Sequence, residues 1–495
     1  MKHRHIGAVA VVSCMAAVAL FTAAIGTSTA HATTRSGSGH TSSLKVVWMA
    51  GYHVPCPPDP CTPSKYDKVG VIKIGATKAK NVLVLEPGTS AAAAYFVPLA
   101  QWIVANEPGW QVWAVQRREN LLEKLTEVNK YKAGKIDSTQ LFDYYLGYLT
   151  DPSVTHHYKP IKNSKVGFTK NWGMDVAVQD LHNVIVAAES LGGQVVLGGH
   201  SLGGSVVTAY ATWDFDGSPG ADGLAGLVYI HGGSGPAVTA SEATSELAAL
   251  DASTASPWLS FGGIAAPYAG LFVTTGAATA LYDPNSASLG QSSGLLPDDL
   301  VPSVPVTNVA QFGYALNVAT SPASLAAAQA NLGTGIDTEG EAPYGWDSTG
   351  ALTPISRYAQ MFVGAGVDNA VGSEWYFPQR LTDDTGAVGD GIANPAQSVL
   401  DVDSTMGSDL PTTLKIYAFC TSLGGTGVLD AAETLATQSG IPSSNLLLVN
   451  ASGTTSSDPL VVNEPVTYAH NDAAGAYPDN YFFDNLETFL AGIAS

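Results

Sequence analysis

A serine flanked by glycines carries the strongest chemical signal in this chain of 495 residues. The segment Gly199-His200-Ser201-Leu202-Gly203 matches the pattern G-x-S-x-G, with a strand-like apolar run before it and a helix-like segment after it. A strand that turns sharply into a helix holds the central residue in a strained backbone conformation, and small residues two positions away remove the resulting clashes. The hydroxyl of Ser201 is therefore the candidate nucleophile.

A histidine near the C-terminus, His470, is the candidate base. It lies in the segment Tyr468-Ala469-His470-Asn471-Asp472, ahead of the terminal helix. A neutral imidazole can take a proton from serine and return it to a leaving group at neutral pH. The alternative interpretation is an ordinary histidine in a loop that faces solvent.

The elements that must position these groups alternate between strands and helices. The hydrophobic spacing predicts strands at 44–48, 69–74, 81–85, 110–115, 194–198, 224–230, 414–420 and 445–449, and helices at 91–105, 175–190, 202–213, 430–438 and 480–493. This alternation predicts a largely parallel sheet covered by helices on both faces. The polar stretch 117–170 is interpreted as an insertion over one end of the sheet.

The region 236–405 breaks this pattern, because it is rich in Ala, Gly, Ser and Pro and shows no regular strands. We interpret it as a mainly helical insertion or cap between two parts of the core, 44–235 and 406–495. Its large aromatic residues either line an apolar acyl pocket or form the core of the insertion itself. They are Trp258, Phe261, Tyr268, Phe272, Trp346, Tyr358, Phe362, Trp375 and Tyr376.

With these motifs in this order, the chain resembles the α/β-hydrolase superfamily, specifically its secreted serine esterases and lipases, over residues 69–235 and 411–495. The resemblance implies an α/β-hydrolase fold with a large, mainly helical cap inserted after the sixth core strand. It also implies a Ser-His-Asp triad in which the acid follows the strand 414–420 and precedes His470. Asp430 is the expected acid, and the alternatives are Glu433, Asp458, Glu464 and Asp472.

Two backbone amides are needed to stabilise the oxyanion that forms when the serine attacks. One is expected from Leu202, and the other from the loop Glu86-Pro87-Gly88-Thr89-Ser90. In this loop Pro87-Gly88 replaces the usual His-Gly pair of the family, so Thr89 is the expected donor and Ser90 the second choice. The segment His231-Gly-Gly-Ser-Gly235 looks like another oxyanion loop, but it follows the nucleophile. We expect it to shape the pocket rim or to begin the cap.

The N-terminus has the parts of a secretory signal over residues 1–32. Lys2 and Arg4 precede an apolar stretch, 6–26, and Ala30-His31-Ala32 supplies the cleavage pattern. The stretch is long enough for an uncleaved membrane anchor, which remains the alternative. After cleavage, residues 33–43 form a flexible leader, and we expect a secreted protein with no stable membrane insertion.

The cysteines fit an oxidising compartment. Cys56 and Cys61 bracket a short proline-rich loop, which favours one local disulfide. Cys420 ends a predicted strand and is expected to be a buried structural thiol.

Charge and motifs exclude several function classes. With Lys+Arg 22 against Asp+Glu 42, the net charge is −20, which argues against binding to a nucleic-acid backbone. No phosphate-binding loop, dinucleotide fingerprint or zinc pattern is evident, so no cofactor is expected. Asp383-Asp384 and the pair Asp401 and Asp403 suggest calcium binding, but a solvated acidic loop explains them as well.

The sequence therefore predicts a secreted serine hydrolase that cleaves carboxylic esters, either small-molecule or lipid esters, through an acyl-enzyme intermediate. The same residues could support acyl transfer, amide hydrolysis or a cofactor-free haloperoxidase activity, because a triad does not specify the acceptor or the leaving group. A catalytically silent binding protein with the same fold is a further alternative.

Overall fold

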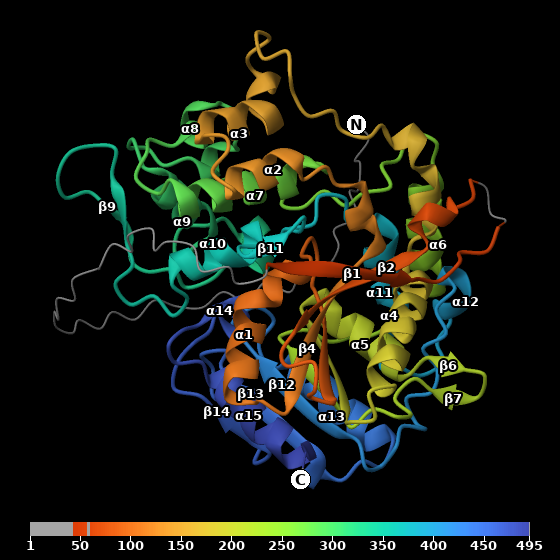
Figure 1. Cartoon of the computed structure of the whole chain (residues 1–495). Coiled ribbons are helices and arrows are strands. Elements are labelled where there is room, and N and C mark those ends of the chain that lie inside the picture. The colour runs from red at the N-terminus through yellow and green to blue at the C-terminus, as the bar shows by residue number, and fades with distance from the viewer. Residues whose placement is uncertain (1–42, 57–59, 495) are drawn as a thin grey trace, which may run out of the picture. The chain divides into compact units, whose positions relative to one another are not determined.

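The computed structural model describes residues 43–56 and 60–494, so the predicted signal sequence lies outside the described residues. One compact unit begins at Leu44 and contains the predicted core. A ten-stranded sheet runs through this unit in the order β11-β1-β2-β4-β3-β5-β8-β12-β13-β14 (Figure 1). The strand β2 runs antiparallel to both of its neighbours, and every other pairing in the sheet is parallel. The predicted α/β architecture with a mostly parallel sheet is confirmed.

Eight strands lie close to the predicted positions, and two short edge strands were not predicted. The eight are β1 (Leu44–Ala50), β2 (Lys68–Ile74), β3 (Asn81–Glu86), β4 (Trp110–Gln116), β5 (Val195–His200), β8 (Gly226–Ile230), β12 (Lys415–Cys420) and β13 (Leu446–Asn450). The two edge strands are β11 (Val367–Asp368) and β14 (Val461–Asn463). They are too short to show a hydrophobic period, and only their pairing with β1 and β13 defines them.

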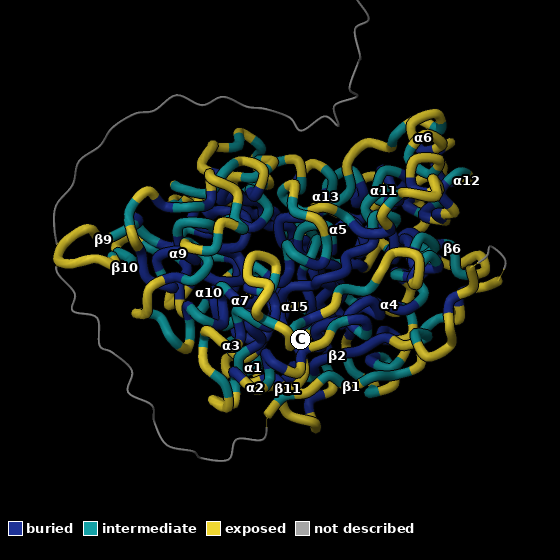
Figure 2. Tube along the Cα trace, turned by 90° about the horizontal axis from the view of Figure 1, so that it is seen from above, coloured by how far each residue is buried: buried dark blue, intermediate teal, exposed yellow. Residues whose placement is uncertain are grey.

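Helices cover both faces of the sheet and bury its alternating side chains. Along β3, Leu83 and Leu85 pack into one hydrophobic core, while Val82 and Val84 pack into the other. The first core includes α1 (Val97–Asn106) and α15 (Tyr481–Ala494), and the second includes α4 (Met174–Glu189), α5 (Leu202–Ala211) and α13 (Gly427–Gln438). Figure 2 shows the buried residues concentrated along the middle of the described chain.

The insertion between β8 and β12 is mainly helical and lies against both cores. Its helices are α6 (Ala240–Asp251), α7 (Tyr268–Tyr282), α8 (Leu289–Ser292), α9 (Asn308–Leu316), α10 (Ile355–Val363), α11 (Gln379–Val388) and α12 (Gln397–Leu400). Helices α7, α9 and α10 join the first core, whereas α11 and α12 join the second. The insertion also contributes the hairpin of β9 (Gly335–Asp337) and β10 (Gly345–Asp347) and the edge strand β11.

The segment after β4 contributes a second group of helices, which packs against the insertion. Helices α2 (Thr126–Lys132) and α3 (Ser138–Tyr145) pack against α7 of the insertion, and Figure 1 shows them gathered near α8 and α9. A disulfide joins Cys56 and Cys61, and Cys420 is buried. Among the residues that the structure describes, no helix is long and apolar enough to span a lipid bilayer.

Candidate active site

Ser201 occupies a strained backbone conformation between β5 and α5. Its φ and ψ angles are 56° and −127°, which place a non-glycine residue at positive φ. A Cβ added to Gly199 would collide with the backbone of Gly203, and one added to Gly203 would collide with the Glu86 carbonyl. Only glycine therefore fits at these two positions of the motif, and the chain forms the sharp turn that the G-x-S-x-G pattern predicts.

The loop after β3 packs directly on this serine. A Cβ added to Gly88 would lie 2.8 Å from the Ser201 Cβ, so the backbone of the loop approaches Ser201 closely. Thr89 and Ser90 line the same pocket as Ser201, and Ser90 has a φ of 54°. Leu202 is the first residue of α5, so its N–H has no acceptor within the helix. The expected oxyanion donors Thr89 and Leu202 thus flank Ser201 on the loop and helix sides.

A buried arginine that was not predicted as a functional residue bonds to the backbone in and next to the predicted oxyanion loop, residues 86–90. The guanidinium of Arg117 donates to the carbonyls of Pro87 at 2.8 Å, Gly88 at 2.9 Å and Ala91 at 2.9 Å. With these three carbonyls turned toward Arg117, the conformation of the loop is fixed on both sides of Thr89. The only sequence signal was the position of Arg117 immediately after a strand, which does not reveal its partners.

Three buried carboxylates surround Arg117. The guanidinium lies 2.8 Å from Glu86, 3.3 Å from Glu119 and 3.1 Å from Glu374. Burial raises the pKa of Glu86 to about 7, although Arg117 opposes this shift. Burial, followed by repulsion from Glu119, raises the pKa of Glu374 well above its ordinary value. The cluster therefore holds one positively charged guanidinium and three carboxyl groups.

His470 lies buried among other histidines next to the elbow, which is the sharp turn at Ser201 between β5 and α5. Its ring centroid is 4.7 Å from that of His200 and 4.8 Å from that of His231. The Nε2 of His200 donates a hydrogen bond to the His470 carbonyl at 3.2 Å, which ties the His470 loop to the residue before Ser201. Burial, together with the two neighbouring histidines, lowers the pKa of His470 well below its usual value, so the ring is neutral at pH 7.

Neither ring nitrogen of His470 has a hydrogen-bond partner within the described chain, so the structure shows no bond to Ser201 or to an acid. Hydrogen bonds between catalytic groups are often long in an unliganded enzyme and tighten when substrate binds. The structure thus brings His470 to the elbow through His200 without completing the contact with the nucleophile.

Asp430, the expected acid, lies exposed in the first turn of α13. It lines a different hollow, together with Gly233 and Ser234. Because both His470 nitrogens are unpaired, the prediction that Asp430 orients His470 finds no contact in the structure.

The alternative acids also have other partners. Glu433 faces Asp458, Asp458 accepts from the Leu460 amide, and Glu464 accepts from Asn485. None of these interactions involves His470.

Asp472 anchors the loop that carries His470. Its buried carboxylate accepts hydrogen bonds from the Ala469 amide at 2.8 Å, the Asn331 amide at 3.0 Å and the Thr353 hydroxyl at 2.7 Å. Burial raises the pKa of Asp472 to about 6, and these three hydrogen bonds oppose the shift. Asp472 therefore fixes the backbone next to His470 and ties it to the insertion.

The second glycine-rich motif lies beneath the elbow. A Cβ added to Gly232 would collide with the Ser201 carbonyl, and the Gly233 carbonyl accepts from Ser205 on α5. His231, which follows β8, accepts a hydrogen bond at Nδ1 from the Thr421 amide after β12, at 2.8 Å. This motif therefore supports the turn and joins two strand ends, and it does not contribute to the oxyanion loop.

One pocket is lined both by the candidate nucleophile and by the predicted oxyanion donor. It has a volume of about 40 Å³, and Thr89, Ser90, His200, Ser201 and Asn471 line it. The Asn471 side chain accepts a hydrogen bond from Tyr95 at 2.7 Å and donates to the carbonyls of Ala327 and Gln329. The residue next to His470 thus joins the core to the insertion.

The strand order β1-β2-β4-β3-β5-β8-β12-β13, with β2 antiparallel to its neighbours and a sharp turn at Ser201 between β5 and α5, defines an α/β-hydrolase fold. His470 follows β14 at the end of this series.

No family model and no curated protein matches this sequence. Among solved structures, the chain is similar to a proposed lipase from Sulfolobus solfataricus, with 14% identity, 90% of this chain and 91% of that chain covered, and a TM-score of 0.42. It is also similar to a thermostable carboxyl esterase from Bacillus coagulans, with 12% identity, 92% and 100% covered, and a TM-score of 0.38.

Proposed function

We propose that this chain is a serine hydrolase that cleaves carboxylic esters with Ser201 as the nucleophile. The observation that carries the proposal is the strained conformation of Ser201 at the end of β5, in a pocket that the Thr89 loop also lines. Backbone strain of this kind persists where the surrounding structure fixes it, and such residues cluster at active sites.

In the proposed reaction, the Ser201 Oγ attacks the ester carbonyl carbon while the neutral ring of His470 takes the hydroxyl proton. The amides of Leu202 and Thr89 stabilise the negative charge on the carbonyl oxygen. His470 then protonates the departing alcohol, and an acyl-enzyme remains on Ser201. Water, deprotonated by His470, attacks this intermediate, and its collapse releases the carboxylic acid and returns the proton to Ser201.

The role of the acid differs from the predicted triad. We assign Asp472 the task of fixing the backbone around His470, because it bonds the Ala469 amide and two groups of the insertion. In this proposal, Asp472 positions the base through the backbone and does not bond to its ring.

The first experiment is the hydrolysis of p-nitrophenyl butyrate by the mature protein and by Ser201→Ala. Removal of a triad nucleophile lowers kcat on the order of a thousandfold or more. Ser205→Ala is the matched control, because Ser205 lies one turn along α5 and bonds the Gly233 carbonyl. Full activity in Ser201→Ala, or a folded wild-type protein that neither hydrolyses esters nor reacts with a fluorophosphonate, would overturn the proposal.

A second pair of variants identifies the base. His470→Asn should lower kcat about as strongly as Ser201→Ala, because the two residues act as a unit. His200→Asn removes a ring that lines the pocket and its hydrogen bond to the His470 carbonyl, but it keeps the His470 imidazole, so it should lower kcat less than His470→Asn does. The opposite order would identify His200 as the base and overturn the assignment of His470.

We also propose that the protein is exported. The disulfide between Cys56 and Cys61 supports an oxidising compartment. Mass spectrometry of protein recovered from the culture medium should show an N-terminus at Thr33. Retention of the whole protein in the membrane with residues 1–32 attached would instead indicate an uncleaved anchor.

A further inference from the structure

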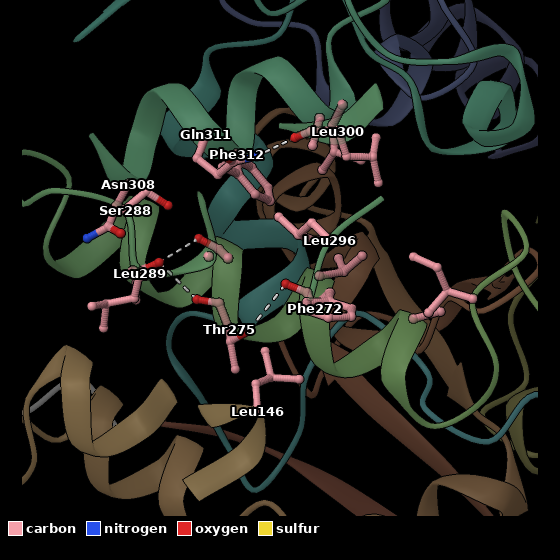
Figure 3. Close-up of a pocket in the computed structure, with 18 of the residues that line it drawn as sticks. Leu146, Phe272, Thr275, Ser288, Leu289, Leu296, Leu300, Asn308, Gln311 and Phe312 are labelled. Carbon is pink, nitrogen blue, oxygen red and sulfur yellow. Dashed lines mark hydrogen bonds between the residues drawn. The ribbon is translucent and has the colours of Figure 1, made fainter. Parts of the chain in front are cut away.

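An apolar cavity lies next to the pocket of Ser201, within the two groups of helices that cover this end of the sheet. Its volume is about 110 Å³, of the same order as the roughly 150 Å³ of an apolar cavity that binds benzene. Figure 3 shows residues of α7, α8 and α9 around it, with Leu146, next to the end of α3, on another side. Both inserted segments, 117–170 and 236–405, therefore contribute to its wall.

The side chains that line the cavity are mostly apolar, and almost all of its polar side chains have hydrogen-bond partners. Leu146, Phe272, Leu289, Leu296 and Phe312 contribute apolar surface, and the described lining contains no charged side chain.

The polar side chains of the wall bond mainly to nearby backbone. The Thr275 hydroxyl donates to the Leu271 carbonyl at 2.7 Å, and the Asn308 amide donates to the Asp283 carbonyl at 2.8 Å. The Gln311 amide donates to the Leu300 carbonyl, which leaves its Oε1 as one buried acceptor without a partner. A ligand in this cavity must therefore be apolar over most of its length.

The cavity and the serine pocket share a wall. Five residues line both spaces: Phe261, Ala269, Val273, Leu316 and Ala328. These shared residues place the apolar cavity directly beside the pocket of Ser201.

We propose that this cavity binds the hydrocarbon chain of the ester, so that the preferred substrates are esters with an unbranched apolar chain of several carbons. This inference rests on the proposed function. Burial of each methylene strengthens binding about fourfold, so a chain that fills the cavity should raise kcat/KM steeply over a short chain. The acyl and the alcohol part of an ester can both supply such a chain, and their chemistry in the cavity is the same.

Two substrate series distinguish these sources. One comprises p-nitrophenyl acetate, butyrate, decanoate and palmitate, and the other comprises methyl, butyl and decyl acetate. A steep rise in kcat/KM along the first series places the acyl chain in the cavity, and a rise along the second places the alcohol chain there. If kcat/KM is flat or falls along both series, the proposal is overturned.

Variants at one position of α7 test the cavity itself. Gly276 lines the cavity but not the serine pocket, and a Cβ added there would lie 3.4 Å from the Phe312 ring, with no other atom as close. Gly276→Phe should therefore fill the space and lower kcat/KM for the preferred long ester at least tenfold, while p-nitrophenyl acetate stays within twofold. Gly276→Ala is the matched control, because it adds only a methyl group.

A cavity-filling substitution on a second helix tests whether the effect of Gly276→Phe comes from the filled cavity or from a local change in α7. Ala315 on α9 also lines the cavity, and Ala315→Phe should reproduce the selective loss. An equal loss for short and long esters in both plugged variants, with melting temperatures unchanged, would overturn the proposal.

A binding measurement separates this proposal from the proposed function. Decanoic acid should bind to Ser201→Ala, as measured by calorimetry, and its affinity should fall at least tenfold in the double variant with Gly276→Phe. If the wild-type protein has no esterase activity while decanoic acid still binds in this way, the proposed reaction is refuted but the chain site is supported. Equal affinity in the two proteins, or no binding to either, would refute the chain site whatever the activity.

Discussion

Two consecutive arginines, Arg117 and Arg118, follow β4, and both are buried, but they hold different parts of the molecule. Arg117 donates to three carbonyls of the oxyanion loop and lies among three carboxylates. Arg118 forms two hydrogen bonds with the Asp180 carboxylate, at 2.6 and 2.8 Å, and one with the Tyr52 carbonyl at 2.8 Å. The two arginines therefore differ in what they hold together. Arg117 bonds to the loop beside Ser201, whereas Arg118 joins α4 to the segment after β1.

The two clusters also differ in their charge balance. Arg118 meets Asp180 in a two-pronged pair, with Asp67 farther away at 3.8 Å. Arg117 shares one positive charge among Glu86, Glu119 and Glu374. An excess of buried negative charge favours protonation of part of the Arg117 cluster, which agrees with the raised pKa values of Glu86 and Glu374. Burial, which is the largest cause of both shifts, and this excess of acid therefore both favour the protonated form of a carboxyl group in the Arg117 cluster.

Arg117→Met tests the site side of this comparison and should have the largest effect. The carbonyls of Pro87, Gly88 and Ala91 lose their donor, so the loop that carries the Thr89 amide is released. We expect kcat for p-nitrophenyl butyrate to fall about 100-fold, as when one oxyanion donor is removed, with KM changed only a few-fold. The free energy of unfolding, measured with urea, should fall by about 3–5 kcal/mol.

Arg117→Lys keeps the charge and guards against a failure of the methionine variant to fold. Lysine cannot reproduce the fork that reaches three carbonyls, so kcat should still fall more than KM rises. An unchanged kcat in a folded Arg117 variant would show that the loop keeps its shape without this residue.

Arg118→Met tests the frame side and should lower stability without lowering kcat. It leaves the buried Asp180 carboxylate without its partner, which costs about 3–5 kcal/mol of unfolding free energy in comparable cases. Because Arg118 has no bond to the oxyanion loop, kcat below the melting transition should stay within about twofold of the wild-type value, the effect expected of a distant, independent site. A loss of kcat like that of Arg117→Met would end the distinction between the two arginines.

The sequence could predict the sharp turn at Ser201 and the core strands because local patterns determine them. The apolar run of β5 and the glycines around Ser201 follow one another in the chain, and steric limits on the turn explain the spacing of Gly199 and Gly203.

The role of Arg117 could not be predicted because its partners are distant in the sequence. Glu86 lies 31 positions away and Glu374 lies 257 positions away, in the insertion. Asp430 shows the converse, because its place after a strand fits a family pattern, whereas the fold leaves it exposed. The apolar cavity also escaped prediction, since its wall combines α3 with α7, α8 and α9.

Stability should depend on pH over different pH intervals in the Arg117 and Arg118 clusters. The pKa of Glu86 is raised from 4.5 to about 7 by burial, so the folded state holds this proton more tightly than the unfolded state. Its contribution to stability is therefore largest below pH 4.5 and is lost as the pH rises toward 7. Burial raises the pKa of Asp180 from 3.8 to about 6. The contribution of Asp180 to stability is therefore lost at lower pH, as the pH rises from 3.8 toward 6.

Glu86→Gln and Asp180→Asn separate these contributions in urea unfolding measured from pH 4 to 8. Each full proton difference changes the unfolding free energy by about 1.4 kcal/mol per pH unit. Glu86→Gln should flatten the decline near pH 6–7, and Asp180→Asn should flatten it near pH 4–6. An unchanged slope in the Gln variant would mean that Glu86 stays ionised in the folded state.

Arg118→Lys should give the smallest effect and sharpen the contrast between the two arginines. A lysine keeps one charged hydrogen bond to Asp180 but loses the second prong and the bond to the Tyr52 carbonyl, so stability should fall by only about 1–2 kcal/mol. The activity should remain at the wild-type level. The same exchange at Arg117 must span three carbonyls as well as carboxylates, so it should affect kcat even where stability recovers. If lysine is tolerated equally at both positions, charge alone is what the oxyanion loop requires, and the guanidinium fork has no positioning role.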